Sequence, residues 1–330
     1  MSDTTFDVLG IGNAIVDVLV QTSDQFLDEN QLTKGTMGLV SAEEQSALYE
    51  KTGQAIESSG GSAANTMAGI AALGGRAAFS GKVKSDQLGH VFAHDIRGAG
   101  VAFTTPQATD GAPTATCLVL ISPDGQRTMQ TYLGACVEFN VQDLDAASIA
   151  VAKVVYLEGY LWDSDSARDA FFEAARIAHE AGRKVALSLS DPFCVDRYRD
   201  GFLTFIEEHV DILFANEDEI LSLYEHDDFD VCAARIKGIV EIAALTRSEK
   251  GSVVVTADQS VTVPASPVEE LIDTTGAGDA YAAGFLTAYT HGRDLKTAAT
   301  LGGHLAAVII QQIGARPSVS VQHLLHGLDG

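Results

Sequence analysis

The chain contains 330 residues, of which 46% are apolar, so it is long enough to bury a sizeable core as one large α/β domain or as two domains. Its 21 basic and 45 acidic residues give a formal net charge of −24. This charge disfavours proteins that hold nucleic acid or an anionic membrane through their overall field.

The N-terminus and the cysteines indicate the compartment. Residues 1–7 lack the basic stretch of a signal peptide, and no segment approaches the roughly 18 apolar residues of a membrane-spanning helix. The four cysteines are scattered and include no Cys-x-x-Cys pair, which fits a reducing compartment better than a disulfide framework or a zinc site. We therefore expect a cytoplasmic protein with no membrane partner.

The first apolar run, residues 6–12, ends in glycine and is typical of a strand buried in a parallel sheet. The third glycine of a dinucleotide-binding fingerprint is missing after it. Instead Asn13 and Asp17 follow, and an amide and a carboxylate at the carboxyl end of a strand suit the vicinal hydroxyls of a sugar. A turn asparagine and a surface aspartate are an equally good interpretation of these two residues alone.

A small sheet outside the main body is predicted from several short extended runs. The segment Ser122-Pro-Asp-Gly125 separates two β-rich runs and predicts a hairpin. Together with extended pieces at 15–20 and 36–40, the hairpin could form a lid over the substrate, built from about 14–42 and 101–133. Arg127 on this hairpin could stabilise a transferring phosphate, although a solvated arginine is as good an interpretation.

The pair Gly60-Gly61 opens a helix made almost wholly of small residues, with Asn65 one turn in. Such a helix can pack very closely on a sheet, and its bare N-terminus can meet a ligand. Ser62 is not part of a Gly-x-Ser-x-Gly elbow, so a hydrolase is disfavoured.

From residue 151 onward strand-like and helical segments alternate. The strand-like runs fall at 154–157, 184–189, 211–214, 241–245 and 252–256. This alternation predicts a mostly parallel sheet with helices on both faces, whose ligands bind beyond the carboxyl ends of the strands. Asn216 and Glu219 follow one of these runs, where a simple helix cap is also a sufficient explanation.

The stretch Asp273-Thr-Thr-Gly-Ala-Gly-Asp279 precedes a helix of small apolar residues and indicates an anion site that contains a base. Its glycines allow a tight turn whose amides point outward at a helix N-terminus. Asp279 in the first turn could accept the proton of an incoming hydroxyl, which is the general-base task in phosphoryl transfer. An ordinary helix N-terminus with acidic residues is the alternative.

These motifs, in this order, resemble the ribokinase-like (PfkB) family of carbohydrate and nucleoside kinases. The matching features are Gly-x-Gly-Asn…Asp at 10–17, the diglycine helix at 60, Asn-x-x-Glu at 216 and Gly-Ala-Gly-Asp at 276. The resemblance covers nearly the whole chain and implies a single ribokinase-like α/β domain over 1–330 with an inserted β-sheet lid. A P-loop kinase is excluded because the Gly-x-x-x-x-Gly-Lys-[Ser/Thr] motif is absent.

The resemblance also implies a role for each matching residue. Asp279 would be the base, and the other members of the transfer centre would be Gly276, Ala277, Gly278 and Arg127. The acceptor would contact Asn13, Asp17, Leu39, Gly60, Gly61, Asn65, Cys117 and Phe193. The nucleotide would lie near Asn216, Glu219, Thr246, Gly251 and His304. Asp273 and Thr275 resemble part of the family's monovalent-cation site.

Within the family, the stretches 12–17, 115–117, 158–160, 189–193 and 210–216 resemble the adenosine kinase pattern. Thr275 departs from it, because that pattern commonly has Asn and the sugar kinases have Thr. The implied activity is phosphorylation of the 5′-hydroxyl of adenosine by ATP, in purine salvage, with Mg²⁺ and a monovalent cation such as K⁺.

Other acceptors keep the same catalytic residues: ribose, fructose, inosine or guanosine. A nonenzymatic nucleoside-binding protein on the same fold is a further alternative. The expected partner is thus a small molecule. We expect a monomer, and an exposed edge of the lid sheet would offer a route to a dimer.

Overall fold

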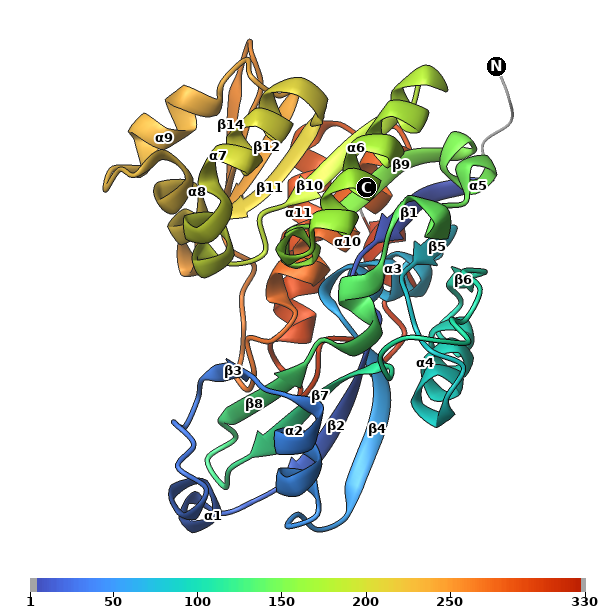
Figure 1. Ribbon diagram of the computed structural model, residues 1–330. Helices are drawn as coiled ribbons and strands as arrows, with labels where there is room; N and C mark the ends of the chain where they lie inside the picture. Colours follow the sequence, from blue (N-terminus) through green and yellow to red (C-terminus); the bar gives the residue numbers. More distant parts are fainter. Residues whose placement is uncertain (1–4, 328–330) are drawn as a thin grey trace.

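The computed structural model describes residues 5–327 and has a large sheet at its centre (Figure 1). The strand order is β14-β13-β12-β11-β10-β9-β1-β5-β6. The strands are β1 (Phe6–Ile11), β5 (Ala77–Ser80), β6 (Ala102–Phe103), β9 (Ala152–Glu158), β10 (Lys184–Ser188), β11 (Ile212–Asn216), β12 (Ile242–Thr246), β13 (Ser252–Val255) and β14 (Ser260–Val263). Only the β12–β13 and β13–β14 pairs are antiparallel among these, so the predicted mostly parallel sheet is confirmed.

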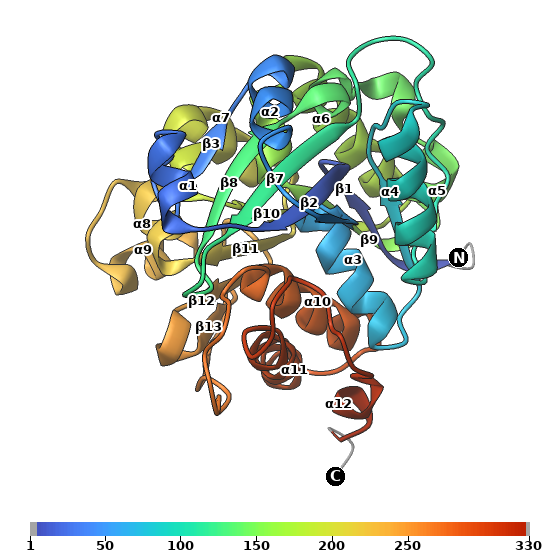
Figure 2. The ribbon, with the colours of Figure 1, turned by 90° about the horizontal axis from the view of Figure 1, so that it is seen from below.

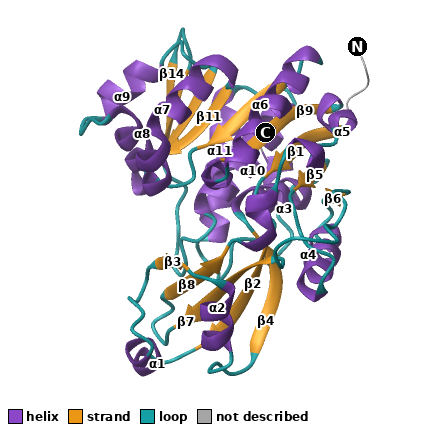
Figure 3. Cartoon of the chain, in the orientation of Figure 1, coloured by secondary structure: helices purple, strands orange, loops and turns teal. Residues whose placement is uncertain are grey.

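Helices cover both faces of this sheet (Figure 3). One face carries α5 (Ala146–Ala150), α6 (Asp165–Glu180), α7 (Pro192–His209), α8 (Glu217–Tyr224) and α9 (Phe229–Ile236). The other carries α3 (Ser62–Ala72), α4 (Gln87–Gly98), α10 (Ala277–Thr290), α11 (Leu295–Ile309) and α12 (Gln322–His326). Short 3₁₀ helices are η1 (Gly134–Glu138), η2 (Val141–Asp143), η3 (Gly159–Asp163) and η4 (Ser248–Lys250).

The two-sided cover explains the apolar runs in the sequence. On β9, Val154 and Tyr156 pack into the core beneath α3 and α10, whereas Val155 and Leu157 pack into the core beneath α6 and α7. A strand buried on both faces needs an apolar side chain at every position. None of the helices within residues 5–327 is long and apolar enough to cross a membrane. Residues 1–4 of the N-terminal segment, where no signal peptide was expected, lie outside the described part.

A second sheet lies below the α/β body in Figure 1, in the order β3-β8-β7-β2-β4. Its elements are β2 (Ile15–Gln21), β3 (Met37–Leu39), β4 (Ala55–Gly60), β7 (Ala115–Ile121) and β8 (Arg127–Tyr132), with α1 (Asp24–Glu29) and α2 (Ala42–Tyr49) beside them. The predicted hairpin is confirmed, because β7 and β8 pair antiparallel around Gly125 at φ +81°. Two strands fall differently from the expected lid segments: β4 belongs to this sheet and β6 to the large one.

The two faces of the small sheet have different surroundings. Val16, Val18 and Val20 of β2 point into a core that also contains Leu27 of α1 and Leu48 of α2. The alternate residues of β2 point the other way. Asp17 pairs in register with Cys117 of β7 on that second face, beside a small apolar cluster. The second face is therefore the one that can meet a ligand.

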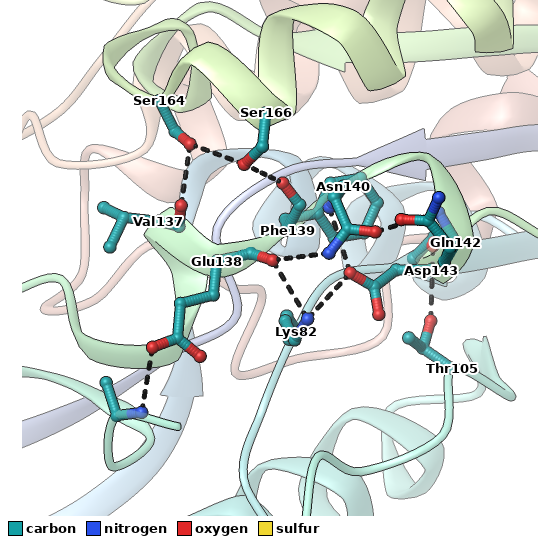
Figure 4. Close-up of polar contacts among 12 residues, drawn as sticks. Lys82, Thr105, Val137, Glu138, Phe139, Asn140, Gln142, Asp143, Ser164 and Ser166 are labelled. Atoms are coloured by element: carbon teal, nitrogen blue, oxygen red, sulfur yellow. Dashed lines mark hydrogen bonds and ion pairs between the residues drawn. The ribbon is translucent and has the colours of Figure 1, made fainter. Parts of the chain in front are cut away.

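Polar contacts fasten the segment between the small sheet and β9 to the body (Figure 4). Lys82 Nζ donates to the carbonyl of Glu138 at 2.9 Å and lies 3.0 Å from the carboxylate of Asp143. Two serine hydroxyls donate to carbonyls of the same segment at 2.7 Å, Ser164 to Val137 and Ser166 to Phe139. The chain therefore leaves the small sheet through a fixed connection.

Helices α10 and α11 pack backbone to backbone at a pair of glycines. A Cβ at Gly284 would come within 2.6 Å of the Leu301 carbonyl and 2.8 Å of the Gly302 Cα, both of which are backbone atoms. Neither can move aside without shifting a helix, and interiors of this density tolerate little extra volume. This contact sets how closely α11 approaches the helix that carries Asp279.

We predict that Gly284→Ala lowers the free energy of unfolding by about 1–3 kcal/mol, because the added methyl forces α10 and α11 apart. Urea unfolding followed by circular dichroism measures this change. Gly98→Ala is the matched control. Gly98 is also helical, but a Cβ there meets nothing within 4 Å, so that variant should be as stable as the wild type or more stable. Equal stability of the two variants would contradict the packing argument.

Candidate active site

The N-terminal turns of α3 and α10 meet on the side of the α/β body that faces the small sheet (Figure 1 and Figure 2). Their N-caps are Gly61 at φ +98° and Gly276 at φ +77°, and neither helix has a side-chain cap. A Cβ at Gly61 would collide with the carbonyl oxygen of Asn13, and one at Gly276 with Ala315. Glycine is therefore needed at both positions, and the first turns keep amides that can face an anion.

The carboxylate of Asp279 links the two helices. Ser62 Oγ donates to Asp279 Oδ1 at 2.6 Å, and Asn65 Nδ2 donates to Asp279 Oδ2 at 3.2 Å. Burial raises the pKa of Asp279 to about 6, while these two donors act in the opposite direction. The side chain is thus an ionised proton acceptor at neutral pH, held at the start of α10.

Asp17 approaches the same place from the small sheet. Burial raises its pKa to about 6, the positive charges of Arg316 and Arg127 oppose the rise, and Asp279 adds to it. A Cβ at Gly60 would overlap the Asp17 carboxylate, so the diglycine also makes room for this side chain. The structure therefore brings Asp17 of the lid close to Asp279 of the body.

Glu158 at the end of β9 fixes Asn13. Its Oε1 accepts from Asn13 Nδ2 at 2.8 Å and from Asn13 N at 3.3 Å, and its Oε2 accepts from Ala63 N at 2.7 Å. Burial raises the pKa of Glu158 to about 7. With its amide nitrogen engaged, Asn13 presents its amide oxygen as an acceptor for a ligand hydroxyl.

Arg127 and Asp273 form an ion pair, with Arg127 Nη2 at 2.6 Å from Asp273 Oδ2. Asp273 also accepts from Thr275 N and Gly314 N, both at 3.0 Å. The hairpin arginine thus contacts the turn at 273–279. The Asp273 carboxylate was also expected, with Thr275, to help bind a monovalent cation, and that role stays a prediction.

Three of the expected nucleotide contacts lie at or just beyond the carboxyl ends of β11 and β12. Asn216 and Glu219 form a reciprocal helix cap at 2.7–2.9 Å, and Thr246 is paired with Asn216 in the sheet. Gly251, at φ +85°, closes the following loop, and His304 lies half-buried on α11. The hydrogen bonds between Asn216 and Glu219 are therefore those of a helix cap, as the alternative interpretation predicted.

A Mg²⁺ ion would be held beside Glu219, although no group of three or more His, Cys, Asp or Glu ligands occurs within residues 5–327. Burial, together with the nearby carboxylates Asp191, Asp218 and Asp279, raises the pKa of Glu219 to about 7. A divalent cation would offset this repulsion. Mg²⁺ keeps several waters and binds mainly to substrate phosphates, so one or two carboxylates suffice.

Three residues were expected to line a base pocket, and they lie on the different elements β3, β7 and α7. Cys117 is buried in the small sheet, where it accepts from Thr131 Oγ1 at 3.3 Å. Leu39 is 51% exposed on that sheet, and Phe193 is 64% exposed at the start of α7, with Arg197 over its ring. Leu39 and Cys117 thus belong to the small sheet and Phe193 to the α/β body, and their role in a base pocket stays a prediction.

Sequence analysis missed three residues of the site. Ser62 was considered only as a hydrolase nucleophile, Glu158 only as part of a resemblance, and Arg316 was given no role. The sequence did contain a signal for Arg316. Cationic residues are few, with 21 Lys and Arg in the chain, and Arg316 directly follows Gly314-Ala315. Its contacts with Asn65 could not be inferred from a separation of 251 residues.

This fold and site define a ribokinase-like phosphotransferase with an alcohol acceptor: a parallel sheet, a β-sheet lid, and an aspartate in the first turn of a glycine-capped helix. The family model described as pfkB family carbohydrate kinase matches residues 37–322, and the chain belongs to that family. ATP is the family's phosphoryl donor.

Known proteins resemble the chain over nearly its full length. An adenosine kinase from Sinorhizobium meliloti is 51% identical with a TM-score of 0.91, and the match covers 98% of this chain and 99% of that one. A probable sugar kinase protein from Rhizobium etli is 49% identical with a TM-score of 0.92 and the same coverage. Adenosine kinase of Saccharomyces cerevisiae is 28% identical over 97% of this chain and 99% of its own length.

We predict that Asp17→Asn stabilises the fold at alkaline pH. The folded pKa of Asp17, about 6, lies above the ordinary value of 3.8 for an aspartate. The wild type therefore loses stability as the pH rises from about 4 through 6, whereas Asn does not titrate. The variant should gain about 3 kcal/mol at pH 8 and nothing below pH 4.

Urea unfolding at pH 4 and pH 8 measures this difference. The exposed residue Asp258 provides the control, because Asp258→Asn removes the same charge outside the site. A gain that is equal in the two variants, or equal at both pH values, would contradict the assignment.

Proposed function

We propose that the protein transfers the γ-phosphoryl group of ATP to the 5′-hydroxyl of adenosine. The observation that carries the proposal is the Asp279 carboxylate, held by Ser62 and Asn65 at the bare N-terminus of α10. The names of the Sinorhizobium meliloti and Saccharomyces cerevisiae relatives support adenosine as the acceptor. Asn13 and Asp17 supply the acceptors that ribose hydroxyls require.

In the proposed reaction, Asp279 accepts the proton of the acceptor hydroxyl as the oxygen attacks phosphorus. The amides of Ala277, Gly278 and Asp279 stabilise the charge that shifts onto the transferring phosphoryl oxygens. Arg127, already beside Asp273, adds a positive charge on the lid side. Mg²⁺ held near Asn216 and Glu219 would neutralise charge on the nucleotide phosphates.

A free sugar is the second candidate acceptor. It would use the same base and anion turn and would differ only in what fills the space between the two sheets. The name of the Rhizobium etli relative and the threonine at position 275 favour this alternative.

The deciding assay measures ADP formation from Mg-ATP with K⁺ present, offering adenosine, inosine, guanosine, ribose and fructose separately. Saturation at the lowest concentration by adenosine, with the sugars inactive, would support the proposal. Turnover with a free sugar alone would replace adenosine but retain Asp279. No turnover with any acceptor would favour a nucleoside-binding protein.

We predict that Asp279→Asn lowers kcat by about 10²-fold or more with a small change in KM, because the amide cannot accept the proton. In the wild type, kcat/KM should rise with pH through about 6 as Asp279 ionises. Steady-state assays across pH 5–9 measure both effects. Near-normal turnover by Asp279→Asn would show that another group is the base.

A further inference from the structure

Arg316 lies in the loop after α11, and its side chain contacts three other segments of the chain. Its Nε donates to Asn65 Oδ1 at 3.1 Å, and its Nη1 donates to Ser59 Oγ at 2.6 Å. Nη1 also lies 3.4 Å from the carboxylate of Asp95 on α4. The guanidinium thus spans the end of lid strand β4, helix α4 and the first turn of α3.

The contacts of Asn65 leave its amide only one favourable orientation. A guanidinium has donors and no acceptor, so the Asn65 atom that faces Arg316 must be the oxygen. An ionised carboxylate accepts and cannot donate, so the atom that faces Asp279 must be the nitrogen. If the amide flipped, a carbonyl oxygen would face the Asp279 carboxylate and disfavour its ionised form.

We propose that Arg316 is a positioning residue of the phosphoryl-transfer site, which holds the Asn65 amide in the orientation that donates to Asp279. The proposal rests on the proposed function, since it concerns the residue assigned as the base. Arg316 touches neither Asp279 nor the transferring group in this arrangement and acts through Asn65.

The far side of Arg316 is itself fixed. Asp95 accepts from Ser59 N at 2.8 Å and from Ser59 Oγ at 2.5 Å, and the same hydroxyl accepts from Arg316. The guanidinium is therefore held at both ends and cannot follow Asn65 if the amide rotates. These contacts of two guanidinium nitrogens with different residues depend on the planar fork of arginine, which lysine lacks.

Several ionisable groups face Asp279 and set the background for any pH effect. They are Asp17 on β2, Tyr156 and Glu158 on β9, Tyr160 in η3, Glu219 on α8 and Arg316. The carboxylates among them disfavour ionisation of Asp279. Arg316 is the cation of this set, and its charge favours ionisation directly as well as through Asn65.

The test compares the pH dependence of kcat/KM in the wild type and in Arg316→Met, which keeps a long side chain without donors. The acid limb of the variant's profile should move up by about one pH unit. The rate should therefore fall about fivefold at pH 6, approach a roughly tenfold loss at lower pH, and recover above pH 8. Arg316→Lys should shift in the same direction by less, and it serves if the Met variant does not fold.

One further variant separates the effect of Arg316 through Asn65 from its direct effect on Asp279, and a second variant is a control. In an Asn65→Ala background, the shift caused by Arg316→Met should shrink by about half or more, because the path through the amide is gone. Arg176→Met is the matched control, since Arg176 lies half-exposed on α6 and forms ion pairs with Glu173 and Glu180 of the same helix. Its pH profile should coincide with that of the wild type.

A readout without substrate separates this inference from the proposed function. The carboxyl carbon of Asp279, assigned by its loss in Asp279→Asn, can be titrated by ¹³C NMR in the wild type and in Arg316→Met. An upward shift of its pKa supports the role of Arg316 even if no acceptor is turned over. A uniform rate loss at all pH values, an unmoved resonance, or an undiminished shift in the Asn65→Ala background would overturn it.

Discussion

The structure depends on one constraint: the N-terminal turn of α3 must lie against the N-terminal turn of α10, which carries the Asp279 carboxylate. Helices α3 and α10 can do so only because glycine caps both, since a Cβ at either cap would strike neighbouring backbone or Ala315. Asp279 then bridges them through Ser62 and Asn65. The close packing of α10 on α11 and of α3 on the sheet follows from the same need for small residues.

The clustered carboxylates serve the reaction and lower the stability of the fold. The protein places Asp17, Glu158, Glu219 and Asp279 close enough to influence one another, in a chain whose net charge is already −24. Burial raises the pKa of each, so each carboxylate costs folding free energy when it is ionised. Arg127 and Arg316 offset only part of this cost, which is typical of a site built for chemistry.

The sequence predicted the architecture well because its signals are local. Apolar runs, the Pro-Asp-Gly turn and glycine-capped helices each depend on residues that are neighbours in the chain. The assignment of β4 was missed because Ala55–Gly60 alternates weakly, with Glu57 and two serines in its middle. The contacts of Arg316, and the Arg127–Asp273 pair across 146 residues, depend on tertiary placement that spacing does not encode.

The cluster of acidic side chains also bears on how the reaction ends. A neutral hydroxyl compound approaches this site without electrostatic penalty, but the phosphate ester formed from it carries about two negative charges at neutral pH. Asp17 and Asp279, which lie close together in the proposed site, would repel that product as soon as the donor nucleotide and its cation no longer screen it. A site that binds its acceptor with carboxylates is therefore also one that expels its product.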